Sequence, residues 1–208
     1  MKIENNAIIL FQGDSVTDAG RIKENLEHMG MGYPKLVSTI FSSLHPELNV
    51  KFINRGVSGN RVRDLKERWD EDCLDLKPTW VSILIGINDC WRRYDSNDPT
   101  EVEKFKEDYR YILQKTKDNL NAKLILCEPF LLPVPEDRRK WREDLDPKIN
   151  AIRELAREFK AIYIPLDGLF TKVSISKETS FWTPDGVHPS AAGHGLVAKA
   201  WLNAVEAL

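Results

Sequence analysis

The segment ILFQGDSVTD, residues 9–18, joins an apolar run to a Gly-Asp-Ser turn. A short apolar run without polar alternation is typical of a strand that is buried on both faces of a parallel sheet. Glycine, aspartate and serine favour turns, so the segment predicts a strand that passes sharply into a helix. In the simplest interpretation Ser15 only caps that helix. The rest of the chain must show whether Ser15 has a chemical role.

The composition predicts a soluble globular protein. The chain has 208 residues, enough for one large α/β domain, and we expect a single domain over residues 1–208. A formal net charge of −2 leaves no electrostatic footprint for nucleic acid or for an anionic membrane. The first apolar run is too short for a signal peptide, so we expect a cytoplasmic protein. Buried free thiols, with no metal-ligand spacing, are expected at Cys73, Cys90 and Cys127.

Runs of β-type residues alternate with helical patterns along the whole chain. The expected strands cover residues 7–11, 50–54, 80–85, 123–127 and 161–165. Apolar stripes at helical spacing lie within residues 36–44, 62–73, 102–112, 149–159 and 196–201. Asp146-Pro147 is interpreted as the N-cap and first-turn proline of the fourth of these helices. Strict alternation of strand and helix predicts a doubly wound parallel sheet with right-handed crossovers.

In such a sheet the ligand site lies beyond the carboxyl ends of the strands. The loops at those ends contain the parts that an acyl-transfer site needs: a nucleophile, a base, a group that orients the base, and donors for an oxyanion. In that order, the candidates are Ser15, His188, Asp185, and the pair Gly59 and Asn88. The long connections of residues 128–146 and 166–188 are expected to form walls or lids around the site.

Each candidate also has a simpler explanation. Ser15 and His188 fit helix caps, Gly59 fits a positive φ, and Asn88 followed by aspartate fits a turn. Together these explanations weaken, because all the candidates fall on one predicted edge of the sheet. Other site types lack their motifs: the chain has neither a P-loop nor G-x-S-x-G, and His188 and His194 are too far apart for a helical zinc pair. We therefore expect no metal, while a flavin-binding protein stays compatible with the fold alone.

Four sequence blocks point to a known family. They are GDSVT at residues 13–17, GVSGN at 56–60, GIND at 86–89 and DGVHP at 185–189, in this order along nearly the whole chain. In these blocks the chain resembles the SGNH, or GDSL, hydrolases. The resemblance implies a flavodoxin-like three-layer α/β/α sandwich with a five-stranded parallel sheet. It also implies a serine esterase that works without a cofactor.

The resemblance also assigns roles within the blocks. It implies that Ser15 is the nucleophile, that His188 is the base, and that Asp185 orients His188. The oxyanion donors would be the backbone N–H groups of Ser15 and Gly59 and the amide of Asn88. Hydrolysis would then pass through an acyl-enzyme intermediate.

A narrower resemblance concerns the substrate. Residues 61–69, RVRDLKERW, and residues 77–95 are similar to the small bacterial acetyl xylan esterases of the same family. This implies a homo-oligomer that acts on acetylated sugars, such as xylo-oligosaccharides, or on other short-chain esters. Trp91 and Trp182 would stack on the sugar rings, although core or interface packing explains them equally well. The alternatives are a lysophospholipase or thioesterase and a non-catalytic sugar- or flavin-binding module; the complete Ser15, Asp185 and His188 set argues against the module.

Overall fold

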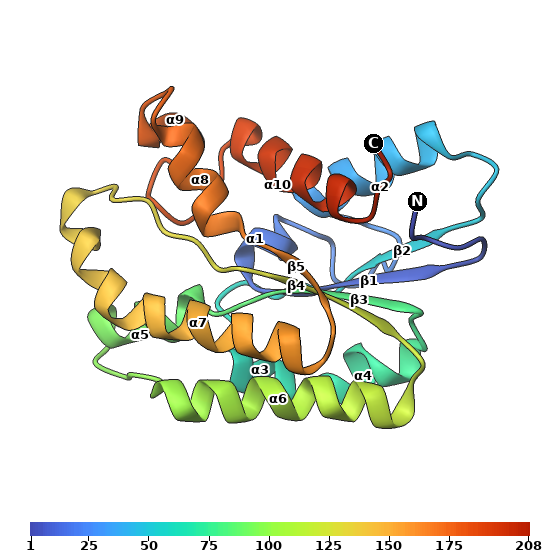
Figure 1. The fold of residues 1–208 in the computed structure, drawn as a ribbon, viewed down its shortest axis with the longest axis horizontal. Coiled ribbons are helices and arrows are strands. Elements are labelled where there is room, and N and C mark those ends of the chain that lie inside the picture. Colours follow the sequence, from blue (N-terminus) through green and yellow to red (C-terminus); the bar gives the residue numbers. More distant parts are fainter.

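The computed structural model describes all 208 residues as a three-layer α/β/α sandwich (Figure 1). Five parallel strands form the central sheet, in the order β2-β1-β3-β4-β5. The strands are β1 (Ile8–Gly13), β2 (Lys51–Asn54), β3 (Trp80–Leu84), β4 (Lys123–Cys127) and β5 (Ile162–Ile164). The predicted fold class and all five predicted strands are confirmed.

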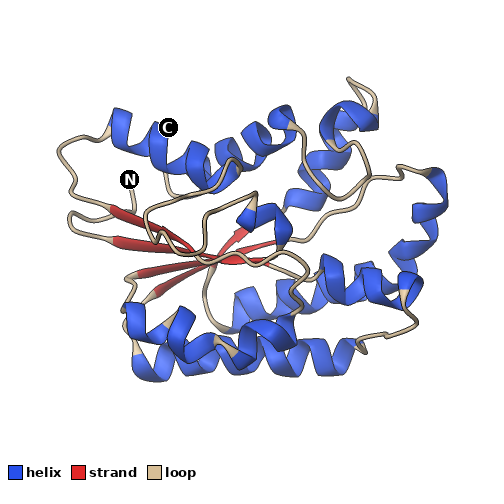
Figure 2. Cartoon of the chain, turned by 180° about the vertical axis from the view of Figure 1, so that it is seen from behind, coloured by secondary structure: helices blue, strands red, loops and turns tan.

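Helices cover both faces of the sheet (Figure 2). One layer contains α2 (Tyr33–Leu44), α8 (Leu166–Ser174), α9 (Thr179–Trp182) and α10 (Ala191–Ala204). The other contains α3 (Val62–Glu67), α4 (Trp69–Asp72), α5 (Ile87–Asp95), α6 (Val102–Asn119) and α7 (Arg142–Glu158). A short helix, α1 (Ser15–Asp18), follows β1, and two 3₁₀ helices complete the chain, η1 (Leu74–Leu76) and η2 (Glu136–Trp141).

Each strand supplies side chains to two separate cores. In β1, Ile9 and Phe11 belong to the core beneath α2 and α10, whereas Leu10 belongs to the core above α3 and α6. This alternation follows from the two-residue period of a strand. In β3, the hydroxyl of Ser82 lies within the first of these cores and accepts a hydrogen bond from Trp201 Nε1 at 3.0 Å. Apolar residues on both faces explain why the strands lack polar alternation in the sequence.

Two predictions about helices are wrong. The fourth helix does not begin at Asp146-Pro147: α7 begins at Arg142, continues from η2, and contains Pro147 within it. Proline there removes the hydrogen bond that its N–H would donate to the Glu143 carbonyl, and its ring crowds that carbonyl; burial of Leu145 and Ile149 favours the helix against this cost. The predicted 62–73 helix is divided at Arg68 into α3 and α4.

The long connections contain more regular structure than the sequence predicts. Most of residues 166–188 form α8 and α9, and residues 136–146 are helical. All three cysteines are buried free thiols, as expected. None of the helices combines the length and the hydropathy that a membrane crossing requires.

Candidate active site

The loops after β1, β2 and β3 meet where the winding of the sheet changes direction. The chain passes from β1 to β2 on one side and then to β3 on the other, so the crevice beyond β1 and β3 is the topological switch point. Gly13 is at the end of β1, and a Cβ there would lie 2.3 Å from the Leu84 carbonyl oxygen. Only glycine allows the two strand ends to approach so closely. The buried Asp14 then accepts the Val16 N–H at 3.0 Å, which ties the turn together.

Three of the predicted residues form a continuous hydrogen-bonded chain. Ser15 Oγ lies 2.9 Å from His188 Nε2, and His188 Nδ1 lies 2.7 Å from Asp185 Oδ2. The other carboxylate oxygen of Asp185 accepts the backbone N–H groups of Val187 at 3.0 Å and of His188 at 2.7 Å. One carboxylate therefore holds both the imidazole and the turn that carries it. This is the arrangement of a nucleophile, a general base and an orienting acid.

The electrostatics of this chain suit proton transfer. The hydrogen bond to Asp185 raises the pKa of His188 above its ordinary value, against the opposing effect of burial. Burial would raise the pKa of Asp185, but hydrogen bonds from the His188 ring and from the backbone N–H groups hold it well below its usual range. Asp185 is thus charged at neutral pH and stabilises an imidazolium. A neutral His188 that donates through Nδ1 presents Nε2 as the acceptor for the Ser15 proton.

The three predicted oxyanion donors follow β1, β2 and β3: Ser15 begins α1, Gly59 lies in the loop before α3, and Asn88 is in the first turn of α5. The backbone N–H groups of Ser15 and Gly59 have no protein acceptor within hydrogen-bond range. Gly59 has a φ of +84°, in the left-handed region that favours glycine. The amide of Asn88 donates one hydrogen to the Asn60 carbonyl at 3.0 Å, which orients the side chain and leaves its second hydrogen free. The arrangement leaves three N–H donors available for a developing oxyanion.

Sequence reasoning missed two buried carboxylates, one of which holds the loop of residues 56–60 and the other the start of α3. Asp18 Oδ2 accepts both the N–H of Ser58, at 3.0 Å, and its hydroxyl, at 2.9 Å. Asp89 Oδ2 accepts the N–H of Val62 at 3.1 Å, and burial raises the pKa of Asp89 to about 7. Asp89 stands in the block of residues 86–89 and Asp18 directly follows the block of residues 13–17, but an aspartate in a turn has a simpler local explanation. Their partners are distant in sequence, so no local pattern indicates them.

The two predicted substrate-binding tryptophans have different surroundings. Trp91, on α5, has its ring 5.9 Å from the His188 ring and 5.4 Å from the Trp141 ring. Trp182, on α9, pairs edge-on with Phe181 at 5.0 Å and packs against the core beneath α8 and α10. The structure therefore brings Trp91, but not Trp182, into contact with the serine–histidine–aspartate chain.

His194, the histidine of α10, is a packing residue. His194 Nδ1 accepts the Tyr33 N–H at 3.1 Å, and burial lowers the pKa of His194 to about 4. His194 is therefore neutral at physiological pH and joins α10 to the start of α2. No group of three or more histidine, cysteine, aspartate or glutamate side chains in the structure could hold a metal ion.

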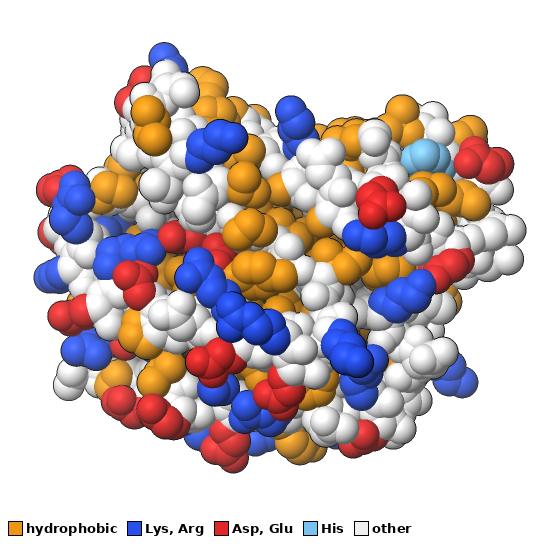
Figure 3. Space-filling view, in the orientation of Figure 1, with side chains coloured by type: hydrophobic (Ala, Val, Ile, Leu, Met, Phe, Trp, Pro, Cys, Tyr) orange, Lys and Arg blue, Asp and Glu red, His pale blue; other side chains and the backbone are white.

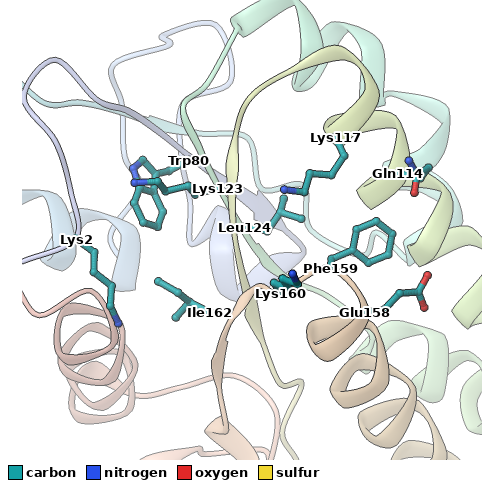
Figure 4. Close-up of a pocket in the computed structure, with 10 residues that line it drawn as sticks. All are labelled: Lys2, Trp80, Gln114, Lys117, Lys123, Leu124, Glu158, Phe159, Lys160 and Ile162. Atoms are coloured by element: carbon teal, nitrogen blue, oxygen red, sulfur yellow. The ribbon is translucent and has the colours of Figure 1, made fainter.

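A separate hollow of about 710 Å³ lies at the opposite edge of the sheet, where the strands begin (Figure 4). Its floor is apolar, and lysines surround it; its lining residues are Lys2, Trp80, Gln114, Lys117, Lys123, Leu124, Glu158, Phe159, Lys160 and Ile162. It contains no nucleophile paired with a base. The candidate active site and this hollow therefore lie at opposite edges of the same sheet.

Comparison with known proteins finds matches along nearly the whole chain. The model of the GDSL-like lipase/acylhydrolase family matches residues 11–196. The acetylxylan esterase of Geobacillus stearothermophilus is 36% identical over 99% of this chain and 96% of its own length. Its crystal structure, Axe2, superposes with a TM-score of 0.92 at 34% identity, covering 99% of this chain and 96% of that one. A GDSL-like lipase from Parabacteroides merdae superposes with a TM-score of 0.94 at 36% identity, covering 99% and 98%.

Solved variants of Axe2 bear on the roles of the residues. Three of them are described as catalytic mutants, in which a serine, an aspartate or a histidine is replaced by alanine. These residue types are the ones that the present structure joins by hydrogen bonds at Ser15, Asp185 and His188.

Proposed function

We propose that this chain removes acetyl groups from short acetylated sugars, xylo-oligosaccharides foremost. It belongs to the GDSL-like lipase/acylhydrolase family and is an esterase of that family. The observation that carries the proposal is the continuous hydrogen-bonded chain from Ser15 Oγ through His188 to Asp185. A serine hydroxyl becomes an effective nucleophile when a base within 3 Å or so removes its proton.

The proposed reaction uses the site in two steps. His188 takes the proton of Ser15 as Oγ attacks the acetyl carbonyl carbon, and Asp185 stabilises the imidazolium. The oxyanion of the tetrahedral intermediate receives hydrogen bonds from Ser15 N–H, Gly59 N–H and Asn88 Nδ2. His188 then protonates the departing sugar oxygen, which leaves acetyl-Ser15. In the second step His188 deprotonates a water molecule that attacks the acetyl-enzyme, and release of acetate returns the proton to Ser15.

Support for an acetylated sugar comes from the relatives. The acetylxylan esterase of Geobacillus stearothermophilus aligns along its whole length, and one of its solved variants is described as an acetyl-xylooligosaccharide esterase. A long acyl chain would instead require an apolar groove beside Ser15. The hollow of about 510 Å³ that is lined mainly by apolar side chains lies beside β5, between α8 and α10, away from the loops that hold Ser15.

The test is a comparison of substrates with one purified protein. We expect hydrolysis of p-nitrophenyl acetate and of acetylated xylo-oligosaccharides, a preference for acetyl over octanoyl esters, and almost no activity in Ser15→Ala. Faster hydrolysis of octanoyl esters would contradict the acetyl esterase and favour a lysophospholipase or thioesterase. We expect Trp91→Ala to lose more activity on the sugar ester than on the aryl ester, with Trp182→Ala as the matched comparison.

We also propose that the chain forms a homo-oligomer. Hydrophobic side chains gather at the centre of one face, between the two helical layers (Figure 3). The hollow beside β5 includes Ile164, Leu169, Val173 and Leu196, and β5 is an edge strand. Apolar surface at an exposed sheet edge favours association with another chain. Sedimentation velocity is the direct test, and a monomer at micromolar concentration would contradict the proposal.

A further inference from the structure

Arg138 contacts the turn that carries the acid and the base, although it comes from a distant part of the chain. It lies in η2, 47 residues before Asp185, and its Nη1 donates a hydrogen bond to the Asp185 carbonyl oxygen. The centre of its guanidinium lies 4.4 Å from the Trp91 ring centroid and 4.7 Å from that of Trp141. Arg138 therefore joins the Asp185 backbone to Trp141 and to Trp91, whose ring lies beside His188.

The turn rests on the segment that precedes Arg138. The Leu132 N–H donates to the Gly186 carbonyl at 2.9 Å, and a Cβ at Gly186 would lie only 2.3 Å from the Leu132 carbonyl oxygen. Apart from Ser15, Arg138 is the only residue outside the turn whose side chain forms a hydrogen bond with residues 184–188. The backbone contact fixes the position of the turn, and Arg138 fixes its orientation toward α5.

We propose that Arg138 is a positioning residue, which holds the Asp185–His188 turn against Trp91 and Trp141 so that His188 stays in line with Ser15. The inference rests on the proposed esterase function and deepens it. A planar guanidinium suits this task because it can stack on two indole rings while one N–H reaches a carbonyl. Trp91 in turn contacts the His188 ring, so the imidazole is held through its acid partner and through its neighbour.

The charge of Arg138 gives the proposal a second readout. The charged or titratable groups facing His188 are Asp185 on its own turn, Asp14 before α1, Arg138 from η2 and His194 from α10. Asp185 and Asp14 raise the pKa of His188, whereas the positive charge of Arg138 lowers it. Loss of the guanidinium should therefore make His188 easier to protonate, and a more alkaline solution would be needed to free the base.

The experiment compares the parent protein with Arg138→Met and Arg138→Lys, with p-nitrophenyl acetate as the substrate. Arg138→Met keeps an unbranched apolar stem but loses the charge and the hydrogen bond. We expect kcat to fall by about 10- to 100-fold, the range that a displaced catalytic group produces. The midpoint of the pH profile should rise by about half a pH unit, as expected for one charge a few ångströms away in a solvated site. Arg138→Lys keeps the charge, so it should keep the parent midpoint and recover part of kcat.

Arg139→Met is the matched control, because Arg139 is adjacent, exposed, and paired only with Glu136. It should leave both kcat and the midpoint unchanged. The proposal is overturned if Arg138→Met matches this control in kcat, or if kcat falls while the midpoint stays at the parent value. Should Arg138→Met fail to fold, Arg138→Lys decides: a reduced kcat at the parent midpoint supports the proposal, and a parent-like kcat overturns it. An inactive parent protein would instead contradict the proposed function itself.

Discussion

At the carboxyl edge of the sheet, Ser15, Gly59 and Asn88 follow three neighbouring strands, whereas the amino edge has an open hollow of about 710 Å³ surrounded by lysines (Figure 4). The hollow is spacious, but the side-chain ammonium groups of Lys117 and Lys160 at its rim have no hydrogen-bond or ion-pair partner within the structure. At the carboxyl edge, polar groups are bonded to one another instead. In this molecule, therefore, oriented and hydrogen-bonded polar groups indicate the chemical site, and empty volume does not.

The two edges also differ in how their charges are held. Asp14, Asp18 and Asp89 are buried at the carboxyl edge, and each accepts a backbone N–H from a loop or from the first turn of a helix. Such hydrogen bonds are costly to break because they leave a buried polar group unpaired. At the amino edge Lys123 pairs with Glu4, and both side chains are more than half exposed. Exposed ion pairs of this kind contribute little to stability. Substitutions should therefore have large effects at one edge and small effects at the other.

The largest expected difference between the edges is in turnover. Ser15→Ala or His188→Ala should each lower kcat by roughly 10⁴-fold or more with the fold intact, because each removes a member of the bonded chain. The double variant should lose little more than either single one. The measurement is kcat on p-nitrophenyl acetate, with circular dichroism as the folding check. Near-normal turnover by folded Ser15→Ala would show that Ser15 is not the nucleophile.

A smaller loss is expected from the oxyanion side of the same edge. Asn88→Ala should lower kcat by roughly 10²- to 10³-fold and leave KM almost unchanged, because the amide acts on charge that develops in the transition state. Asn119→Ala is the control: Asn119 is exposed on α6 and donates only to the Lys115 carbonyl. If the Asn88 variant changes KM alone, Asn88 binds the ground-state substrate instead.

The pH dependence should distinguish His188 from an ordinary exposed histidine. Because Asp185 raises the pKa of His188, kcat/KM should rise with pH through a midpoint above the usual value of about 6.5. Asp185→Asn should move the midpoint down as well as lower the rate. A flat profile between about pH 5 and 9, a range that spans the usual histidine value, would exclude a histidine base.

The raised pKa of His188 also makes the stability of the fold depend on pH, in the direction opposite to activity: activity rises with pH, whereas this contribution to stability falls. A pKa that is raised in the folded state means that the protonated His188 stabilises the fold below the unfolded pKa. This contribution is lost as the pH rises through the folded pKa. Urea titrations on the two sides of the midpoint should show it in the parent protein and show less of it in Asp185→Asn. An equal pH dependence in both proteins would mean that another group is responsible.

The smallest effect is expected at the amino edge. Lys117→Glu combined with Lys160→Glu reverses two charges beside the hollow but breaks no hydrogen bond or ion pair of the structure. We expect the free energy of unfolding to change by less than about 0.5 kcal/mol for each substitution and kcat to stay within a factor of two or so. A loss of turnover comparable to that of Asn88→Ala would show that the two edges are functionally coupled.

Most strands and helices of this protein can be predicted from the sequence, because their buried residues recur at a regular spacing. The apolar runs of β1 and β3 and the stripes of α2 and α6 identify elements, since burial of one face repeats at a fixed local spacing. The predicted start of α7 at Asp146-Pro147 is wrong, because a helix tolerates an internal proline when the residues around it are sufficiently buried. The Asp-Pro dipeptide alone does not show how far its neighbours are buried. Trp182 was placed at the site by its neighbours in sequence, whereas its ring packs against the core.

The sequence by itself determined the fold class, the candidate nucleophile, base and acid, and the edge of the sheet on which they meet. These inferences rest on local order: the strand ends of a doubly wound sheet share one edge, Ser15 and Asn88 come just after strands, and Asp185 and His188 share one short block before the last helix. Only the tertiary structure decided that Arg138 binds the turn of Asp185, and that Asp18 holds Ser58 across 40 residues. Those contacts depend on how separate loops pack against one another, and side-chain packing between distant segments has no period in the sequence.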